Sequence, residues 1–592
     1  NNTGVGMQAL TKLTTGSGNT AIGLAAMESN TTGSDNTALG RSALAANTTA
    51  ADNTAIGHDA LLSCTEGHSN TIVGSHSGDA ITTGDNNVAL GFNALSAEDT
   101  GNRSVAIGDF SLAAQNNDDS NYNVGVGYAA GTSITTGTLN TLIGGISGDA
   151  ITTGANNTAV GHDALGATTT GNSNTAVGED CLQANTTASN NTAVGRRAMF
   201  SNTTGTDNVA MGHNALDANT TASENTAIGH DALTENTTGA ENVAVGSSAL
   251  SANTTASNNV AVGRMALRDN TTGADNTAVG HQAMISNTTG ANNTAVGKGA
   301  LDANTEGVQN TAVGDSALGV NTTGNTNAAF GIGALDANTT ADNNTAVGAY
   351  ALSTVVSGTR NTAVGRFALF TTTASDNVAV GYNCLDTCST GSNNTAVGTE
   401  CMDANTTGEA NVAMGYRTLD ANTTGSNNTA VGQQALGANT TGGANVIIGK
   451  GAATNQTTAS NNVVIGESAG SNITTKTECI LIGREANTSA NTASELVIGT
   501  SITGRGDNTG LIYPPGGGSL FQGTNGTTFA QTSDERIKKN IVDNNDGFNK
   551  LKDIQVRNFV YRSEEEVTDL PSNLAVKKEG IQLGEVGGGC VA

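Results

Sequence analysis

The sequence predicts an all-β fold: a parallel β-solenoid of about 30 turns, assembled as a trimer, with a small α+β segment at the C-terminus. Three observations indicate this class, namely a 17-residue repeat, a scarcity of aromatic residues and a change of composition after residue 499. The 592 residues include 78 Gly, 3 Pro and no Trp, and only 3% are aromatic. Because a globular enzyme of this length fills a thick core with aromatic side chains, this composition predicts a thin core of small and mid-sized residues.

A glycine preceded by an apolar residue recurs at a constant spacing over most of the chain, starting at Gly6 and Gly23. One spacing is longer, the one that precedes Gly127, and the spacings that lead to Gly381 and Gly499 are shorter. About 30 copies with so few shifts of phase indicate a stacked repeat, in which each unit buries its apolar side chains against the next. Positions in the repeat are counted below from this glycine as zero.

The segment before the glycine predicts a short strand. Position −1 is Val, Ile, Leu, Met or Phe in every copy, from Val5 to Ile498, while position −2 is usually Ala and position −3 usually Thr or Val. Alternation bounded by Gly and Asn is typical of a strand, and we expect the −1 side chain to point into the core. The glycine suits a corner with a positive φ or a close backbone approach. The abundance of Thr, Asn and Gly argues against a helix.

A correlated exchange predicts that positions +4 and +7 share one interior. Most copies carry Leu or Met at +4 and Asn at +7, whereas four copies carry Gly at +4 and Ile at +7: Gly78 and Ile81, Gly131 and Ile134, Gly148 and Ile151, Gly470 and Ile473. Volume lost at one position is restored at the other, as close packing requires. The usual Asn at +7 is then at least partly buried, and stacked Asn side chains can form a hydrogen-bonded ladder.

One turn per repeat gives a rod of roughly 140 Å, since neighbouring strands lie ~4.8 Å apart. Each turn would bury only about two large apolar residues, so a single coil of this thinness is marginal without association. A closed cyclic trimer would bury the remaining apolar faces.

The cysteines are predicted to be small packing residues, because they replace residues of the repeat. Cys181, Cys384 and Cys401 lie at +3, where Ala is usual, and Cys64 and Cys388 lie at +7. A disulfide between Cys384 and Cys401, one repeat apart, stays an open alternative.

The sequence predicts no metal and no cofactor. The seven His residues, such as His58, His162, His213 and His230, fall mostly at +1, a surface corner, and are interpreted as solvated. No Cys or His spacing is typical of a metal site. Calcium remains an alternative because the net charge is −27, although acids such as Asp217 and Asp302 occur once per repeat.

Two surface functions are alternatives to a structural interpretation of the Asn and Thr residues. Asn47-Thr48-Thr49 and its counterparts are formal glycosylation motifs, but a buried Asn at +7 argues that they are structural. Rows of Thr on a flat β face are also compatible with ice binding.

The acidic balance argues against binding of nucleic acid and of anionic membranes, and no apolar run is long enough to span a membrane.

The units Asn157-Thr158-Ala159-Val160-Gly161 and Ser104-Val105-Ala106-Ile107-Gly108 resemble the head repeats of trimeric autotransporter adhesins. The resemblance covers residues 1–499. It implies a trimeric left-handed parallel β-roll that binds host surfaces. The unit of this chain is longer than that of the family.

The C-terminal part divides into a neck, residues 500–532, and a charged segment, residues 533–592. The neck contains Pro514 and Pro515 followed by glycines, and the charged segment contains Ile537, Ile541 and Leu551 with Lys between them, which predicts a helical stretch.

The run from Ser533 to Ile541, Ser-Asp-Glu-Arg-Ile-Lys-Lys-Asn-Ile, resembles the opening of the intramolecular chaperone domain of phage tailspikes and tail fibres. The resemblance implies a partial domain of this kind, which drives trimer assembly and then cuts itself off. It further implies Ser533 as the self-cleavage nucleophile and Lys538 as its base, a pairing that is chemically sensible because a desolvated Lys can activate a hydroxyl.

Together these features predict an extracellular, trimeric fibre protein, a viral tail fibre or spike that binds a glycan or protein receptor on a host surface. A turnover enzyme is not expected; at most Ser533 and Lys538 cleave the chain once. The alternatives are a cellular surface adhesin with the same solenoid and an ice-binding repeat protein. The longer unit around Gln115 to Tyr122 is the one irregularity expected to protrude.

Overall fold

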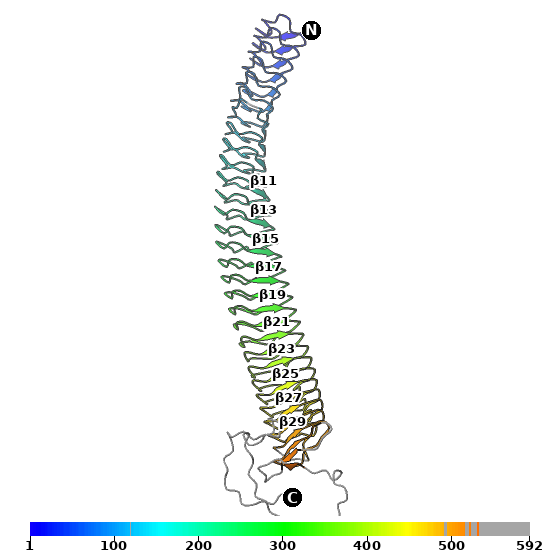
Figure 1. Cartoon of the computed structure of the whole chain (residues 1–592). Coiled ribbons are helices and arrows are strands. Elements are labelled where there is room, and N and C mark those ends of the chain that lie inside the picture. The colour runs from blue at the N-terminus through cyan, green and yellow to red at the C-terminus, as the bar shows by residue number, and fades with distance from the viewer. Residues whose placement is uncertain (119, 490–493, 515–519, 523–529, 532–592) are drawn as a thin grey trace, which may run out of the picture. The chain divides into compact units, whose positions relative to one another are not determined.

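The chain folds into a parallel β-solenoid in which each repeat makes one turn (Figure 1). The computed structural model describes residues 1–118, 120–489, 494–514, 520–522 and 530–531. The chain divides into two compact units, Asn1–Ala530 and Gln531–Ala592, and nearly all described residues belong to the first. The described residues contain no helix, and so none that could cross a membrane. The prediction of an all-β solenoid is confirmed for this part of the chain.

Each turn contributes one short strand, and strands β1 to β31 pair in parallel in chain order. In β10 and β11, Ala159 lies opposite Ala176, so equivalent repeat positions form columns along the sheet. Strand β32 pairs antiparallel with β31. The bounds are β1 Thr3–Val5, β2 Thr20–Ile22, β3 Thr37–Leu39, β4 Thr54–Ile56, β5 Thr71–Val73, β6 Val88–Leu90, β7 Val105–Ile107, β8 Val124–Val126, β9 Thr141–Ile143, β10 Thr158–Val160, β11 Thr175–Val177, β12 Thr192–Val194, β13 Val209–Met211, β14 Thr226–Ile228, β15 Val243–Val245, β16 Val260–Val262, β17 Thr277–Val279, β18 Thr294–Val296, β19 Thr311–Val313, β20 Ala328–Phe330, β21 Thr345–Val347, β22 Thr362–Val364, β23 Val378–Val380, β24 Thr395–Val397, β25 Val412–Met414, β26 Thr429–Val431, β27 Val446–Ile448, β28 Val463–Ile465, β29 Ile480–Ile482, β30 Leu496–Ile498, β31 Gly510–Ile512, β32 Leu520–Gln522 and β33 Ala530–Gln531.

The strand faces the core with its middle residue, which corrects the expectation that position −1 points inward. In β3, Ala38 is fully buried at −2, whereas Leu39 at −1 is 45% exposed. The same pattern, buried in the middle and more open on both sides, recurs in β2 to β30. The alternation was predicted correctly, but the predicted inward residue was wrong. The larger residues of the turn already fill most of the narrow interior, and in most turns the remaining space at −2 fits only Ala.

Positions +4 and +7 share one interior, as predicted, and position −2 belongs to it as well. A methyl group added to Gly78 at +4 would lie 3.1 Å from Cδ1 of Ile81 at +7 and 3.3 Å from Cδ1 of Ile72 at −2. A methyl group on Gly148 would lie 2.8 Å from Cδ1 of Ile151. The glycine at +4 therefore makes room for the isoleucine at +7 and, in these turns, for a large residue at −2.

This shared interior predicts energetic coupling between Leu267 at +4 and Asn270 at +7. Leu267→Gly alone should cost about 3–4 kcal/mol, because it opens a cavity, while the φ of Leu267, 50°, suits glycine. Asn270→Ile alone should cost about 2–5 kcal/mol, because it overpacks the interior and leaves the buried partners Asn253 and Asn287 without their hydrogen bonds to Asn270. The double variant should lose about 2 kcal/mol less than the sum, since the isoleucine fills the cavity.

Native-state hydrogen exchange of the amides in β15 to β17 measures these differences locally, which suits a long repeat that does not unfold in one step. Strictly additive losses would show that the two side chains do not share a space.

The Asn residues at +7 form the expected ladder. From Asn185 to Asn338, ten successive turns carry a buried Asn, and in the nine turns from Asn202 onward its Nδ2 donates to Oδ1 of the Asn one turn earlier, at distances from 2.7 to 3.2 Å. Asn47, which opens a formal glycosylation motif, is also fully buried. The Asn of this motif therefore serves the interior, as predicted.

A second Asn ladder, at position −4, was not predicted. The backbone N–H and Nδ2 of Asn36 both donate to Oδ1 of Asn19, each at 3.1 Å, and Nδ2 also donates to the carbonyl oxygen of Ala50 at 2.8 Å. These bonds satisfy backbone groups that the short strands leave unpaired, and so each turn is held to the next on a second side.

The repeat glycine occupies a corner that no other residue fits. Gly212 has a φ of 138°, and an added Cβ would lie 2.4 Å from the carbonyl oxygen of Gly229 in the next turn. The predicted positive φ and the predicted close approach are therefore both confirmed at this corner.

Candidate functional site: an apolar stripe along the sheet

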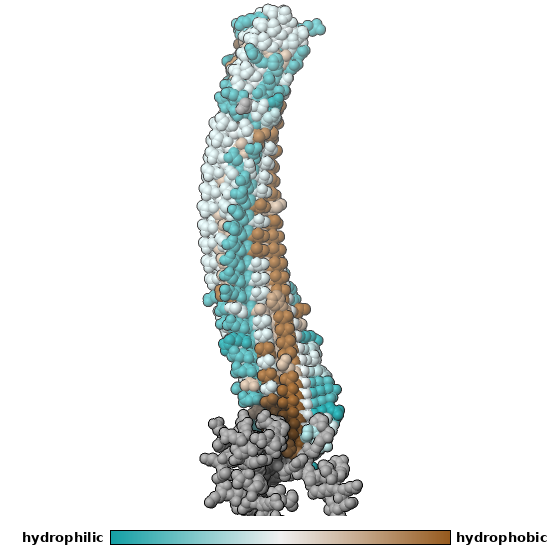
Figure 2. Space-filling model, in the orientation of Figure 1, coloured by the Kyte–Doolittle hydropathy of each residue, from teal (hydrophilic) through white to brown (hydrophobic). Residues whose placement is uncertain are grey.

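The outward −1 side chains of β1 to β30, from Val5 to Ile498, form one continuous column, called here the apolar stripe. Its exposed members include Val5 at 56%, Leu90 at 49%, Phe330 at 41% and Met414 at 45%. Figure 2 shows it as a band of hydrophobic side chains along one side of the turns. The stripe follows directly from the reversed strand face, because residues expected in the core lie on the surface.

The stripe becomes wider near its C-terminal end. In most turns position −3, the other outward residue of the strand, is Thr or Val, but in β27 to β30 it is always an aliphatic residue: Val446, Val463, Ile480 and Leu496. Val446 is 37% exposed and Ile480 is 41% exposed. The outer face of the sheet is therefore most apolar in the turns nearest the neck (Figure 2).

The outer face of the sheet, which consists of the stripe and the −3 column, is large enough for a stable interface. Thirty turns at ~4.8 Å and two outward columns ~7 Å apart give on the order of 1,000 Å² for this face. A stable interface buries about 800 Å² per partner. The stripe supplies the continuous apolar half of this area, and the −3 column supplies Thr, Val and other aliphatic residues.

The predicted self-cleavage residues, Ser533 and Lys538, lie outside the described residues, as does the helical stretch expected from Ile537 to Leu551. The neck is described in part: it adds β31 to the end of the parallel sheet and β32 beside it.

The longer turn packs against a buried acid of the preceding turn. Glu98 occupies the ladder position +7 and is fully buried, and its Oε2 accepts hydrogen bonds from Gln115 Nε2 at 2.8 Å and Asn121 Nδ2 at 2.9 Å. Burial raises the pKa of Glu98, and the hydrogen bond from Gln115 partly opposes the shift. Beside it, the Arg103 guanidinium lies 5.6 Å from the ring centre of Tyr122. Gln115 and Asn121 of the irregular unit are thus held by an internal polar network.

The cysteines are packing residues. The six described cysteines are buried and free, so Cys384 and Cys401 form no disulfide in this structure. Burial raises the pKa of both Cys64 and Cys181 to about 12, which keeps the thiols protonated and unreactive at neutral pH.

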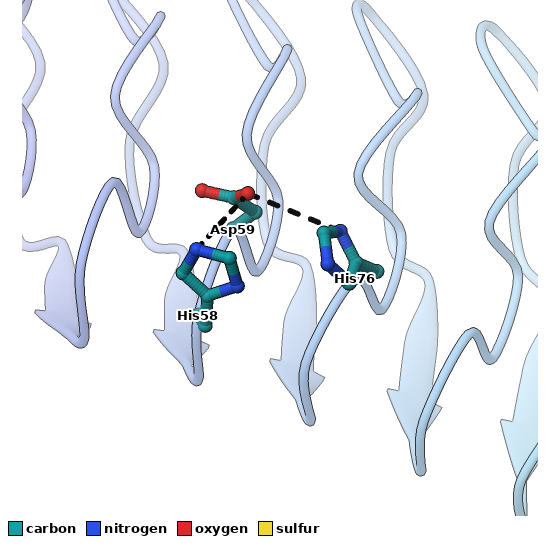
Figure 3. Close-up of side chains that lie close together, drawn as sticks. All are labelled: His58, Asp59 and His76. Carbon is teal, nitrogen blue, oxygen red and sulfur yellow. Dashed lines mark ion pairs between the residues drawn. The ribbon is translucent and has the colours of Figure 1, made fainter.

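Two groups of potential metal ligands lie at the corner after the strand, where the histidines were expected to be solvated. In the first, His58, Asp59 and His76 are each only partly exposed and converge from two adjacent turns (Figure 3). The second contains His213, His230 and Asp231. Spacing rules for metal motifs miss both groups, because their members are about one repeat apart. Aligning the sequence on its 17-residue period would have placed them side by side.

Comparisons with protein-family models, with curated proteins and with solved structures find no match to this chain. What the stripe and the corner groups do is therefore inferred from their geometry and chemistry.

Proposed function

We propose that the chain is the repetitive rod of an extracellular attachment fibre, a viral tail fibre or spike, which assembles as a homotrimer and binds a glycan or protein on a host surface. The observation that carries this proposal is the apolar stripe, which runs the full length of a solenoid of near-identical turns. A surface of this kind serves assembly rather than turnover of a substrate.

The stripe favours copies of the same chain as partners. A partner must present an apolar line that repeats every ~4.8 Å over roughly 140 Å, and a second copy of the solenoid has that spacing by construction. A closed ring of three chains lets three stripes face one axis and leaves no stripe open, whereas an open arrangement would continue to add chains. The net charge of −27 opposes lateral association of finished rods.

The C-terminal segment, residues 533–592, is proposed to aid this assembly. Its resemblance to tailspike chaperone domains assigns Ser533 as nucleophile and Lys538 as base in a single self-cleavage, after which the trimer remains. The wider stripe of β27 to β30 lies next to the neck in sequence, where association guided from the C-terminus would begin.

A denaturing gel of the expressed chain, heated and unheated, beside Ser533→Ala tests the proposal. We expect a slow unheated band that collapses on heating, because a long apolar interface resists detergent. We also expect a heated wild-type band that lacks the segment 533–592, whereas Ser533→Ala should stay at full length. A full-length monomer band in every lane would contradict both the trimer and the self-cleavage.

A cellular surface adhesin would share this geometry. Immunolabelling separates the two origins, because it shows whether the protein is carried by virions or by the surface of cells.

Ice binding is the second candidate, favoured by outward Thr residues on the same flat face, such as the exposed Thr37 and Thr71. Thermal hysteresis measured on the purified protein tests it, and its absence would exclude it.

A further inference from the structure

We propose that His58, Asp59 and His76 form a binding site for a divalent transition-metal ion, zinc in the first place. The site lies at the corner between the turns of β4 and β5, where the three side chains point toward one another (Figure 3). It is separate from the apolar stripe and does not depend on the proposed function.

The distances fit a tetrahedral ion. Asp59 Oδ2 lies 3.3 Å from His58 Nε2 and 3.9 Å from His76 Nδ1, and the three ligand atoms all lie within 4.8 Å of one another. Zinc bonds of about 2.0–2.1 Å in tetrahedral geometry place neighbouring ligand atoms about 3.3–3.4 Å apart. Small side-chain rotations would therefore close the site around an ion, with a fourth position left for water or a further ligand.

Two buried polar atoms at the site lack a hydrogen-bond partner. His58 Nε2 is enclosed and makes no hydrogen bond, although the Asp59 carboxylate is close. Asp79 Oδ1 is also enclosed and unpaired, while its Oδ2 lies 3.6 Å from His76 Nδ1. Because buried polar groups are normally paired, these atoms indicate a missing partner. A cation would satisfy the imidazole, and the charges of Asp59 and Asp79 would balance a divalent ion.

The backbone holds the two histidines in place. The amide of His76 donates to the carbonyl oxygen of His58 at 3.0 Å, so the turns cannot slide past one another. The rings lie edge to face with centroids 5.1 Å apart. Ligands fixed by a hydrogen-bonded scaffold lose little freedom on binding, which favours affinity.

The second group provides an internal comparison. His230 Nδ1 lies 2.9 Å from Asp231 Oδ2, but the Arg196 guanidinium lies 3.4 Å from His213 Nε2. That fixed positive charge disfavours a cation, and His230 is more exposed than either histidine of the first group. We therefore expect the first group to bind zinc more tightly.

Zinc titration of the full chain against a chromophoric chelator tests the site, with cobalt as a spectroscopic probe. We expect one tight zinc site per chain and the strong visible absorption of tetrahedral cobalt. His76→Asn should lower the affinity by about 100-fold or more, since it removes a ligand, and Asp79→Asn by about 10–100-fold, as outer partners do. Asn93 stands at the same repeat position as His76 in the next turn, with a φ of 53°, so the substitution suits the backbone.

His58→Ser is the second ligand variant, because Ser75 occupies its position one turn later. His162→Ser is the matched control, as His162 stands at the same position but belongs to neither group. The control should keep the tight site and both ligand variants should lose it. Three outcomes would overturn the proposal: no saturable zinc binding, tight binding that survives both ligand variants, or tight binding lost only when His213 is replaced.

Discussion

Four lysines in the apolar stripe are expected to convert the assembled protein into single chains, of 58.7 kDa where the segment 533–592 is retained, as measured by light scattering. The substitutions are Ile107→Lys, Met211→Lys, Phe330→Lys and Met414→Lys, each at an outward position that is at least 36% exposed. They divide the outer face of the sheet into five segments of about 200 Å² each, far below the roughly 800 Å² per partner that a stable interface needs. Each lysine also brings like charges together at the axis of a trimer, where burying a charge costs several kcal/mol.

The single chain should tolerate these lysines, because its own core does not use the stripe. A matched control places four lysines on another exposed column, position +9, as Thr83→Lys, Thr221→Lys, Thr340→Lys and Thr424→Lys. The control should keep the mass of the wild-type assembly and the same circular dichroism. An unchanged mass in the stripe variant would mean that the chains associate through another surface, or not at all.

Gly212→Ala is expected to break the solenoid locally, with a loss of about 3 kcal/mol or more, because it combines backbone strain and overpacking. Its φ of 138° is unfavourable for any residue with a Cβ, and that Cβ would lie 2.4 Å from the carbonyl oxygen of Gly229. The clash is with backbone, so no side-chain rotation relieves it. Since each turn contacts only its neighbours, the damage should stay near β13 and β14.

Limited proteolysis read by mass spectrometry should show a new cleavage site near these strands. Gly299→Asn is the control: Gly299 has a φ of 60°, the nearest atoms to an added Cβ are 3.8 Å away, and Asn is found with a similar φ at the equivalent Asn214. The control should resist protease as the wild type does. Equal resistance of Gly212→Ala would refute the role assigned to the corner glycine.

The local chemistry of the turn was readable from the sequence. The repeat period set the number of turns, the Gly at zero marked the corner, and the exchange between Gly78 and Ile81 identified two interior positions. The burial of Asn at +7 and its ladder followed from that exchange. These features depend on residues within one turn, or on identical residues in adjacent turns, so the repeat itself displays them.

The direction of the strand was not determined by the sequence. An alternating strand has two faces, and hydrophobicity favoured Leu39 over Ala38 as the inward residue, yet the structure buries the alanine. The width of the interior determines which face of the strand is buried, because the residues at +4 and +7 occupy the same interior. Only the closed turn shows how little space remains. Because the strand buries position −2, the side chains at −1 lie on the surface and form a candidate assembly surface.

The sequence alone determined the repeat, the corner glycine, the shared interior and the Asn ladder at +7. Each of these features depends on residues of one turn or on the same repeat position in adjacent turns. The buried face of the strand, the hydrogen bonds of the second Asn ladder at −4 and the distances between the ligand atoms of His58 and His76 emerged only in the folded coil. The physical reason is that these features depend on distances across a turn and between turns. Closure of the coil and its backbone hydrogen bonds set those distances, and residue type does not.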